Sequence, residues 1–138
     1  MSRRIVITVL IWFVSLLGLA EAQGPSVGGR AINVSLIRLI ANPQAFDGRH
    51  VRIAGYLANN GLDKAVGVYV TELDGRNFII ANSVDLDVEE STVDRFVGKY
   101  VIFDATFHAP SGPLADYLNG RLDRVSGIRL WNQGDPPK

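Results

Sequence analysis

The sequence predicts a mainly β fold with two short helices and five strands. Apolar and polar residues alternate in several stretches, as in strands with one buried face, and turns rich in Gly, Asn and Pro separate these stretches. The stretch FDGRHVRIAGYL, residues 46–57, returns in altered form as FVGKYVIFDATF, residues 96–107. Two short segments change to the spacing of three and four residues that is typical of a helix.

The first helix is predicted in NVSLIRLIANP, residues 33–43. Asn33 is suited to cap its N-terminus, and the step Asn42-Pro43 ends it, because proline cannot continue a helix from the preceding residue. The apolar face of this helix comprises Leu36, Ile37 and Ile40.

Residues 50–57 read as the first strand, and residues 66–70 as the second, because valines occupy alternate positions there. The pair Asp74-Gly75 is a turn signal that leads into a third strand at residues 76–84. Together these patterns predict a β-hairpin over residues 66–84.

The second helix is predicted over residues 87–97. Its apolar residues recur three and four positions apart, and Asp87 with Glu90 three residues later has the form of a capping box. Gly98 ends the helix.

Two further strands are predicted in the last third of the chain. Alternation resumes at residues 101–107, and the final strand covers residues 121–131. Its interruption by Ser126-Gly127 indicates a bulge or a sharp bend, and we expect a structural role for Gly127.

The repeated stretch is interpreted as architecture used twice. In each copy the aromatic residue, Phe46 or Phe96, is expected to anchor the last turn of a helical segment. The glycine, Gly48 or Gly98, is expected to supply the left-handed residue that ends the segment before a strand begins. The polar residues between the copies differ, so the repeat does not predict a ligand cage.

The N-terminal residues 1–22 have the pattern of a secretory signal peptide. Arg3 and Arg4 precede an uncharged apolar run at residues 5–20, and small residues lie around the cleavage position after Ala22. The run is shorter than the roughly 20 residues that span a bilayer, so cleavage is favoured over retention as an anchor.

The remaining chain is predicted to form one domain. Residues 23–32 read as a flexible lead-in, residues 33–131 as the folded domain and residues 132–138 as a disordered tail, since Gly and Pro are frequent at both ends. A domain of this length can bury a sufficient core without disulfides.

The composition of the chain excludes some classes of function. Removing residues 1–22 leaves 12 basic and 13 acidic residues, a balance that argues against a dedicated binder of duplex nucleic acid. The chain contains no cysteine, which, with the export signal, favours a periplasmic or secreted location in a bacterium. It also lacks the cysteine to which a lipoprotein anchor is attached.

The order of five strands, with a helix between the third and the fourth, is that of an OB-fold-like Greek-key barrel with a leader helix. The stretch LIRLIANPQAFDGRHVRIAGYL resembles the opening of small OB-fold-like domains in uncharacterised bacterial exported proteins, and the resemblance extends over residues 34–131. The residues that carry it are Asn42, Pro43, Phe46, Asp47, Gly48, Arg49, Val51, Gly55 and Tyr56. Related domains bind oligonucleotides, oligosaccharides, proteins or small ions, so the resemblance implies a fold and not a ligand.

Catalytic and metal chemistry are not predicted. The acidic run at residues 85–90 lacks the spacing of a calcium loop, and His50 and His108 are too far apart in sequence to form a zinc motif. Neither Ser111 nor Ser126 lies in a nucleophile elbow. We therefore expect no catalytic residue, no metal and no cofactor.

The best candidates for ligand contact are polar and aromatic side chains around the predicted OB-fold binding face. Tyrosine can stack on a base or a sugar ring, with support from a neighbouring cation. These candidates are Tyr69 and Thr71 on the outward side of the second strand, Arg76 in the turn, Lys64 in the first loop, and Tyr117 and Arg121 around the loop after the fourth strand.

The sequence thus favours an exported, non-catalytic binding module whose partner is an envelope protein or a glycan. Two alternatives stay open at this point: a domain that binds single-stranded nucleic acid, and a structural component of an envelope assembly. The near-neutral charge disfavours the nucleic-acid alternative, although a local basic patch can compensate for a neutral total.

Overall fold

The computed structural model describes residues 29–61, 65–115 and 118–132. Six strands lie in these ranges: β1 (Ile32–Asn33), β2 (His50–Asn59), β3 (Val66–Tyr69), β4 (Ser83–Leu86), β5 (Tyr100–His108) and β6 (Arg121–Leu130). The described helices are α1 (Leu36–Ala41), α2 (Glu72–Arg76) and α3 (Glu90–Val93), and four 3-10 turns lie at Pro43–Phe46, Ile80–Asn82, Asp94–Phe96 and Gly112–Leu114. The prediction of a mainly β fold is confirmed.

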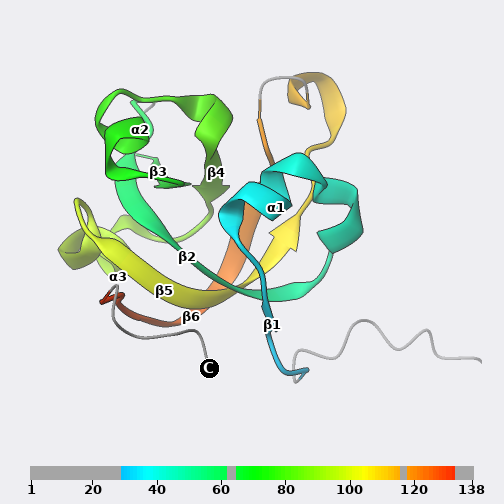
Figure 1. Cartoon of the computed structure of the whole chain (residues 1–138), viewed down its shortest axis with the longest axis horizontal. Coiled ribbons are helices and arrows are strands. Elements are labelled where there is room, and N and C mark those ends of the chain that lie inside the picture. Colours follow the sequence, from blue (N-terminus) through cyan, green and yellow to red (C-terminus); the bar gives the residue numbers. More distant parts are fainter. Residues whose placement is uncertain (1–28, 62–64, 116–117, 133–138) are drawn as a thin grey trace, which may run out of the picture.

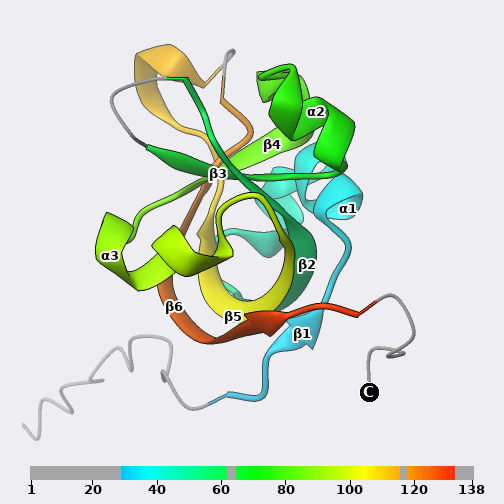
Figure 2. The same cartoon turned by 90° about the vertical axis from the view of Figure 1, so that its left-hand side faces the viewer.

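The strands form one mixed sheet with ring-like hydrogen bonding. The strand order is β1-β2-β3-β4-β6-β5, and β5 also pairs with β2, so the ladder returns to the strand near which it began. The pairs β1–β2 and β4–β6 are parallel and the other pairs are antiparallel. Figure 2 shows the strong curvature of β5, which pairs with β2 along one edge and with β6 along the other.

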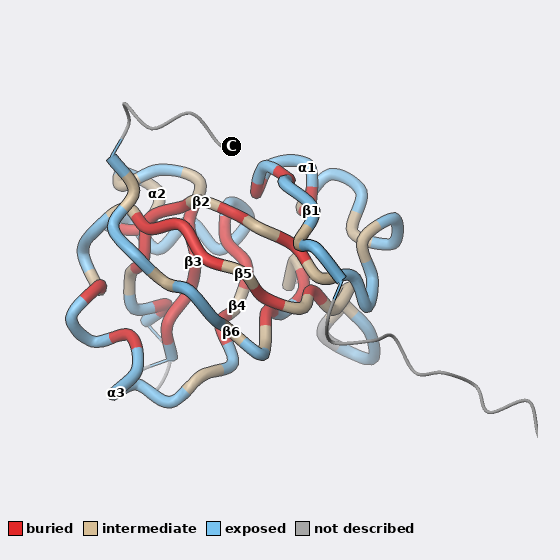
Figure 3. The backbone as a smooth tube through the Cα atoms, turned by 90° about the horizontal axis from the view of Figure 1, so that it is seen from below, coloured by how far each residue is buried: buried red, intermediate tan, exposed pale blue. Residues whose placement is uncertain are grey.

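The hydrophobic core lies between the curved strands and is closed by α1 and α3. Inward residues alternate along β2 and β5, as expected for strands with one buried face. Figure 3 shows the buried segments concentrated in the strands, while most of α3 and many of the connections are exposed. The fully buried core side chains include Leu39, Val51, Ile53, Leu57, Val68, Val84, Val93, Val101, Phe103, Phe107 and Leu122.

The two copies of the repeat pair with each other. β2 and β5 are antiparallel, and Ile53 lies opposite Phe103, its equivalent in the second copy. Each glycine donates its N–H to the far end of the other copy: Gly48 to the carbonyl of Phe107 at 2.8 Å, and Gly98 to that of Leu57 at 2.7 Å. The copies are therefore related by an approximate twofold rotation about the centre of the ladder.

The junction conformation expected for the repeat is confirmed in both copies. Phe46 and Phe96 are the last residues of 3-10 turns, and Gly48 and Gly98 follow with φ of 69° and 79°. Glycine is favoured in this left-handed region because it carries no Cβ.

The first helix is shorter than predicted. Its N-cap is Ser35, whose hydroxyl accepts the N–H of Arg38, and not Asn33, which belongs to β1. Ile37 is 61% exposed rather than part of the buried face. The predicted stop is confirmed, because α1 ends at Ala41 and Pro43 begins a separate 3-10 turn.

The predicted hairpin has the correct strand pairing but the wrong connection. β3 and β4 are antiparallel, with Val68 opposite Val84. Asp74-Gly75 is not a tight turn, because both residues lie in α2, where Thr71 and Asp74 form a capping box. The third strand is confined to Ser83–Leu86, so the predicted strand residues before it form helix and turns.

The second predicted helix is also reduced, to α3 and the 3-10 turn that follows it. The capping box expected at Asp87 is wrong, because the N-cap is Glu89 and its side chain makes no capping hydrogen bond. The predicted bulge in the last strand is confirmed at Gly127, where β6 gains one residue relative to β5 and φ is 62°.

Candidate functional site

An apolar groove lies on the outer face of β2 and β5, between α1 and the end of β6. Its volume is about 480 Å³, within the range of roughly 300–1,000 Å³ that is usual for ligand pockets. In the view of Figure 1, α1 and the C-terminal end of β6 lie on opposite sides of β2. The groove is lined by Asn33, Val34, Ser35, Leu36, Ile37, Arg38, Arg52, Ala54, Gly55, Val70, Tyr100, Ile102 and Trp131.

The segment before and within α1 forms one wall of the groove. Ser35 caps the helix, and the N–H of Val34 donates to the carbonyl of Arg52 at 3.1 Å, which ties this segment to β2. Leu36 is buried against the core, whereas Ile37 projects toward solvent beside the groove. The wall is therefore held by hydrogen bonds and by the buried side chains of Val34 and Leu36, while Ile37 stays accessible.

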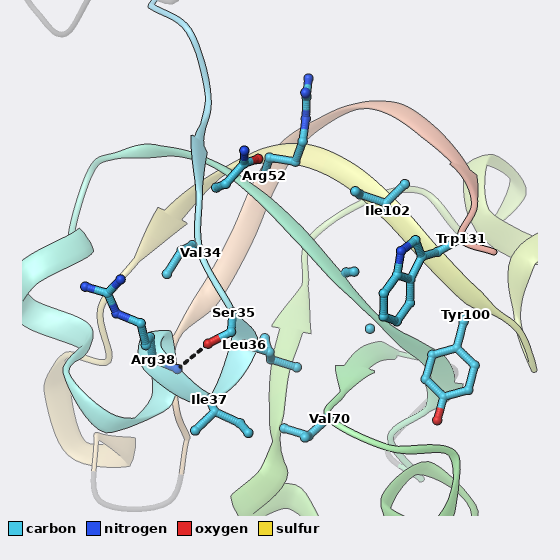
Figure 4. A pocket seen from close by; sticks show the side chains of 13 residues that line it. Val34, Ser35, Leu36, Ile37, Arg38, Arg52, Val70, Tyr100, Ile102 and Trp131 are labelled. Carbon is cyan, nitrogen blue, oxygen red and sulfur yellow. Dashed lines mark hydrogen bonds between the residues drawn. The ribbon is translucent and has the colours of Figure 1, made fainter. Parts of the chain in front are cut away.

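Two aromatic side chains form the opposite wall (Figure 4). The N–H of Trp131 donates to the carbonyl of Tyr100 at 3.0 Å, and the two rings meet edge to face with centroids 6.2 Å apart. The Tyr100 hydroxyl accepts the N–H of Glu72 at 2.9 Å, and its ring also packs against Tyr56. These contacts fix the aromatic wall from both sides.

The polar end of the groove is marked by an ion pair across β2 and β5. Arg52 donates from Nε and Nη2 to the two carboxylate oxygens of Asp104, at 2.6 and 2.8 Å. These hydrogen bonds hold the pKa of Asp104 below its ordinary value. In Figure 4 the side chains of Arg52 and Arg38 point away from the centre of the groove, so its interior is mainly apolar.

A second, polar hollow of about 310 Å³ contains Asp85, His108 and Arg121. Burial raises the pKa of Asp85, and His108 Nε2 lies 3.0 Å from a carboxylate oxygen of Asp123. Ser111 lines the same hollow, but no hydrogen bond joins it to His108 in the described part of the chain. A nucleophile activated by a base is therefore not assembled among the described residues.

The predicted binding face is only partly accessible. Tyr69 does lie on the face opposite to Val66 and Val68, but the expectation that it is available to a ligand is wrong, because it is 0% exposed. Burial, with a contribution from the Asp85 carboxylate, raises the pKa of its hydroxyl. Other segments cover this outer face, which local alternation does not reveal.

The other candidates are not brought together into one site. The Thr71 hydroxyl is engaged in capping α2 with Asp74, and Arg76 forms an ion pair with Glu72 on the same helix. Arg121 faces the polar hollow, 3.5 Å from Asp87. Lys64 and Tyr117 lie outside the described residues, as do the predicted signal peptide 1–22, residues 23–28 of the predicted lead-in 23–32, and all of the predicted tail 132–138 except its first residue.

The groove residues were missed by sequence reasoning. The sequence pattern places Trp131 at the end of a strand and Ile37 on the apolar face of a helix, and it predicts no ligand contact for either. Ile37 shares helical spacing with buried residues, so the pattern alone assigns it to the wrong face. The position of Trp131 beside Tyr100 depends on pairing between β5 and β6, for which no local pattern exists.

No group of three or more metal-ligating side chains occurs among the described residues. Within the same ranges, no helix has the length and hydropathy required to cross a membrane. Comparisons of the chain with family models, with curated proteins and with solved structures give no match.

Proposed function

We propose that this chain is an exported, non-catalytic binding module whose apolar groove holds an apolar segment of a protein partner. The signal-peptide pattern at residues 1–22 supports export, to the periplasm or the exterior. The strand order β2-β3-β4-β6-β5-β2 supports an OB-fold-like barrel, and small domains of that kind commonly act by binding. The proposed partner is a protein of the cell envelope.

The observation that carries the proposal is the groove itself. A ligand-sized hollow with aliphatic and aromatic walls lies open on the surface, and Ile37 at its edge is 61% exposed. Exposed apolar surface of this kind marks interaction sites, because covering it removes unfavourable contact with water.

The chemistry of the walls favours a protein segment over a glycan. A sugar presents hydroxyl groups that need hydrogen-bond partners when they leave water. Here the lining is mainly aliphatic and aromatic, the Tyr100 hydroxyl oxygen accepts the N–H of Glu72, and the Arg52 guanidinium is paired with Asp104, so few polar groups face a sugar. Apolar side chains of a partner match the aliphatic and aromatic lining and bring no hydroxyl groups that need hydrogen-bond partners.

Site-directed photo-crosslinking tests this proposal. A photoreactive amino acid is placed at residue 37 or, as a matched control, at residue 73, because Leu73 is also an exposed aliphatic residue on a helix, at 69%, and does not line the groove. Both proteins are irradiated in an extract of the cell envelope. We expect a discrete protein adduct from residue 37 and none from residue 73.

A charged substitution at the same position provides a second test. Ile37→Glu puts a charge at the apolar wall and should abolish partner recovery in a pull-down, whereas Leu73→Glu should leave it intact. Equal recovery by the two variants, or equal adducts from both positions, would contradict the assignment of the groove.

A further inference from the structure

A basic hollow lies between the Asp94–Phe96 turn and the end of β6. It is lined by Arg95, Phe96, Lys99, Ile128, Arg129 and Leu130. Three of these side chains are cationic and none is acidic, although the chain as a whole has no net charge. The clustering therefore creates a local positive field that the composition does not show.

Two of the three cations are held in place by neighbouring groups. Lys99 Nζ donates to the carbonyl of Arg95 at 2.7 Å, and the Arg95 guanidinium lies over the ring of Phe96, 4.6 Å from its centroid. Such contacts reduce the side-chain entropy that is lost when a ligand binds. No ion pair neutralises any of the three cations in the described part of the chain.

Arg129 connects this basic hollow with the apolar groove. It lies opposite Ile102 in the β5–β6 ladder, and directly paired residues place their side chains on the same face of a sheet. Ile102 lines the groove, and the positive charge of Arg129 also contributes to the lowered pKa of Asp104 at the polar end of the groove. The two features are thus adjacent parts of one surface, joined at the end of β6.

We infer that the partner segment carries acidic residues next to its apolar ones, with the apolar side chains in the groove and the carboxylates over Arg95, Lys99 and Arg129. This inference rests on the proposed function and adds the charge of the partner to it. Arg52 is already neutralised by Asp104, so the attraction is concentrated at the basic hollow. A phosphate backbone is the weaker match, because the adjoining groove is mainly apolar and offers few donors or acceptors to base edges.

Synthetic peptides test the inference in the chain carrying Trp12→Phe, in which Trp131 is the sole tryptophan. Three labelled peptides share a run of four leucines and valines and differ in the next four residues, which are all Glu, all Gln or all Lys. Binding is followed by anisotropy of the label, and Trp131 emission reports occupancy of the groove. We expect the Glu peptide to bind about tenfold more tightly than the Gln peptide, and this advantage to shrink as salt screens the charges.

Arg129→Gln identifies the surface, and Arg124→Gln is its matched control on the same strand, since Arg124 is exposed and lines none of the three hollows described above. We expect Arg129→Gln to weaken binding of the Glu peptide about threefold and to leave the Gln peptide unchanged. Arg124→Gln should affect neither peptide.

The outcomes separate this inference from the proposal on which it rests. Equal binding of the Glu and Gln peptides, both lost in Ile37→Glu, would overturn the acidic partner and leave the groove assignment standing. Failure of all three peptides to change Trp131 emission would contradict the groove assignment itself. Low-salt binding of a labelled oligothymidylate, lost in Arg129→Gln but not in Arg124→Gln, would overturn the inference in favour of single-stranded nucleic acid.

Discussion

The two copies of the repeat, residues 46–57 and 96–107, have the same backbone and different surfaces. Their main-chain hydrogen bonds correspond one to one: Leu57 donates to the carbonyl of Lys99 and Phe107 to that of Arg49, each at 3.0 Å. Both copies also turn at a left-handed glycine before the strand begins. The residues that the two copies share therefore determine the backbone conformation.

The outward side chains break this symmetry. Arg52 faces Asp104 across the ladder, and the rotation that relates the copies converts this pair into Ile102 facing Ala54. One end of the shared face is consequently an ion pair and the other is apolar. The groove lies toward the apolar end, so the positions in which the copies disagree determine where a ligand can bind.

The largest expected effect comes from an inward position at which the copies differ. Gly55 corresponds to Ala105, yet a Cβ on Gly55 would lie 2.5 Å from Val68 Cγ1 and 2.9 Å from the carbonyl oxygen of Tyr69. Because Val68 is fully buried and stiff, we expect Gly55→Ala to lower the free energy of unfolding by about 3 kcal/mol. Urea denaturation measures the change.

The equivalent position in the second copy provides the control. Ala105 is fully buried and accommodates its methyl group, so Ala105→Gly should cost only about 1 kcal/mol, from lost burial and greater freedom of the unfolded chain. A larger cost for Ala105→Gly than for Gly55→Ala would show that the close approach of β3 to β2 is wrong.

A smaller effect, equal in the two copies, is expected at the junction glycines. Gly48→Ala and Gly98→Ala meet no close contact, since the nearest atom is the Tyr56 hydroxyl, 3.8 Å from a Cβ on Gly98. The left-handed backbone conformation alone then disfavours alanine, and each substitution should lower the free energy of unfolding by about 1 kcal/mol. Thermal unfolding of both variants checks the equality, and a difference above about 1 kcal/mol would contradict the twofold relation.

Much of the fold could be predicted because local patterns determine it. The alternation in residues 50–57 and 101–107, the helix stop at Pro43 and the bulge at Gly127 depend on neighbours in the sequence. Residues 70–82 were predicted wrongly because Asp74-Gly75 fits both a hairpin turn and the first turns of a helix. The capping box between Thr71 and Asp74 decides for the helix.

The groove could not be predicted, because it depends on segments that are distant in sequence. Ile37, Tyr100 and Trp131 meet only after β5 has paired with β2 and β6. The prediction that Tyr69 is accessible to a ligand is wrong for the same reason. Its strand face was identified correctly, but whether another segment covers that face is a property of the complete fold.

The smallest effect is expected at the charged end of the shared face. The lowered pKa of Asp104 in the folded state means that its ionised form stabilises the protein above the pKa of the unfolded state, roughly 3.9. This contribution is lost as the pH falls from about 4 through the lower folded pKa.

Asp104→Asn should therefore be slightly less stable than the parent at pH 7 and should lose less stability between pH 5 and about 2. The first copy has no counterpart to this titration, since the equivalent of Asp104 there is the uncharged Ala54. Urea midpoints at several pH values measure the slope, and parallel curves for parent and variant would show that the Arg52 pair contributes nothing to folding.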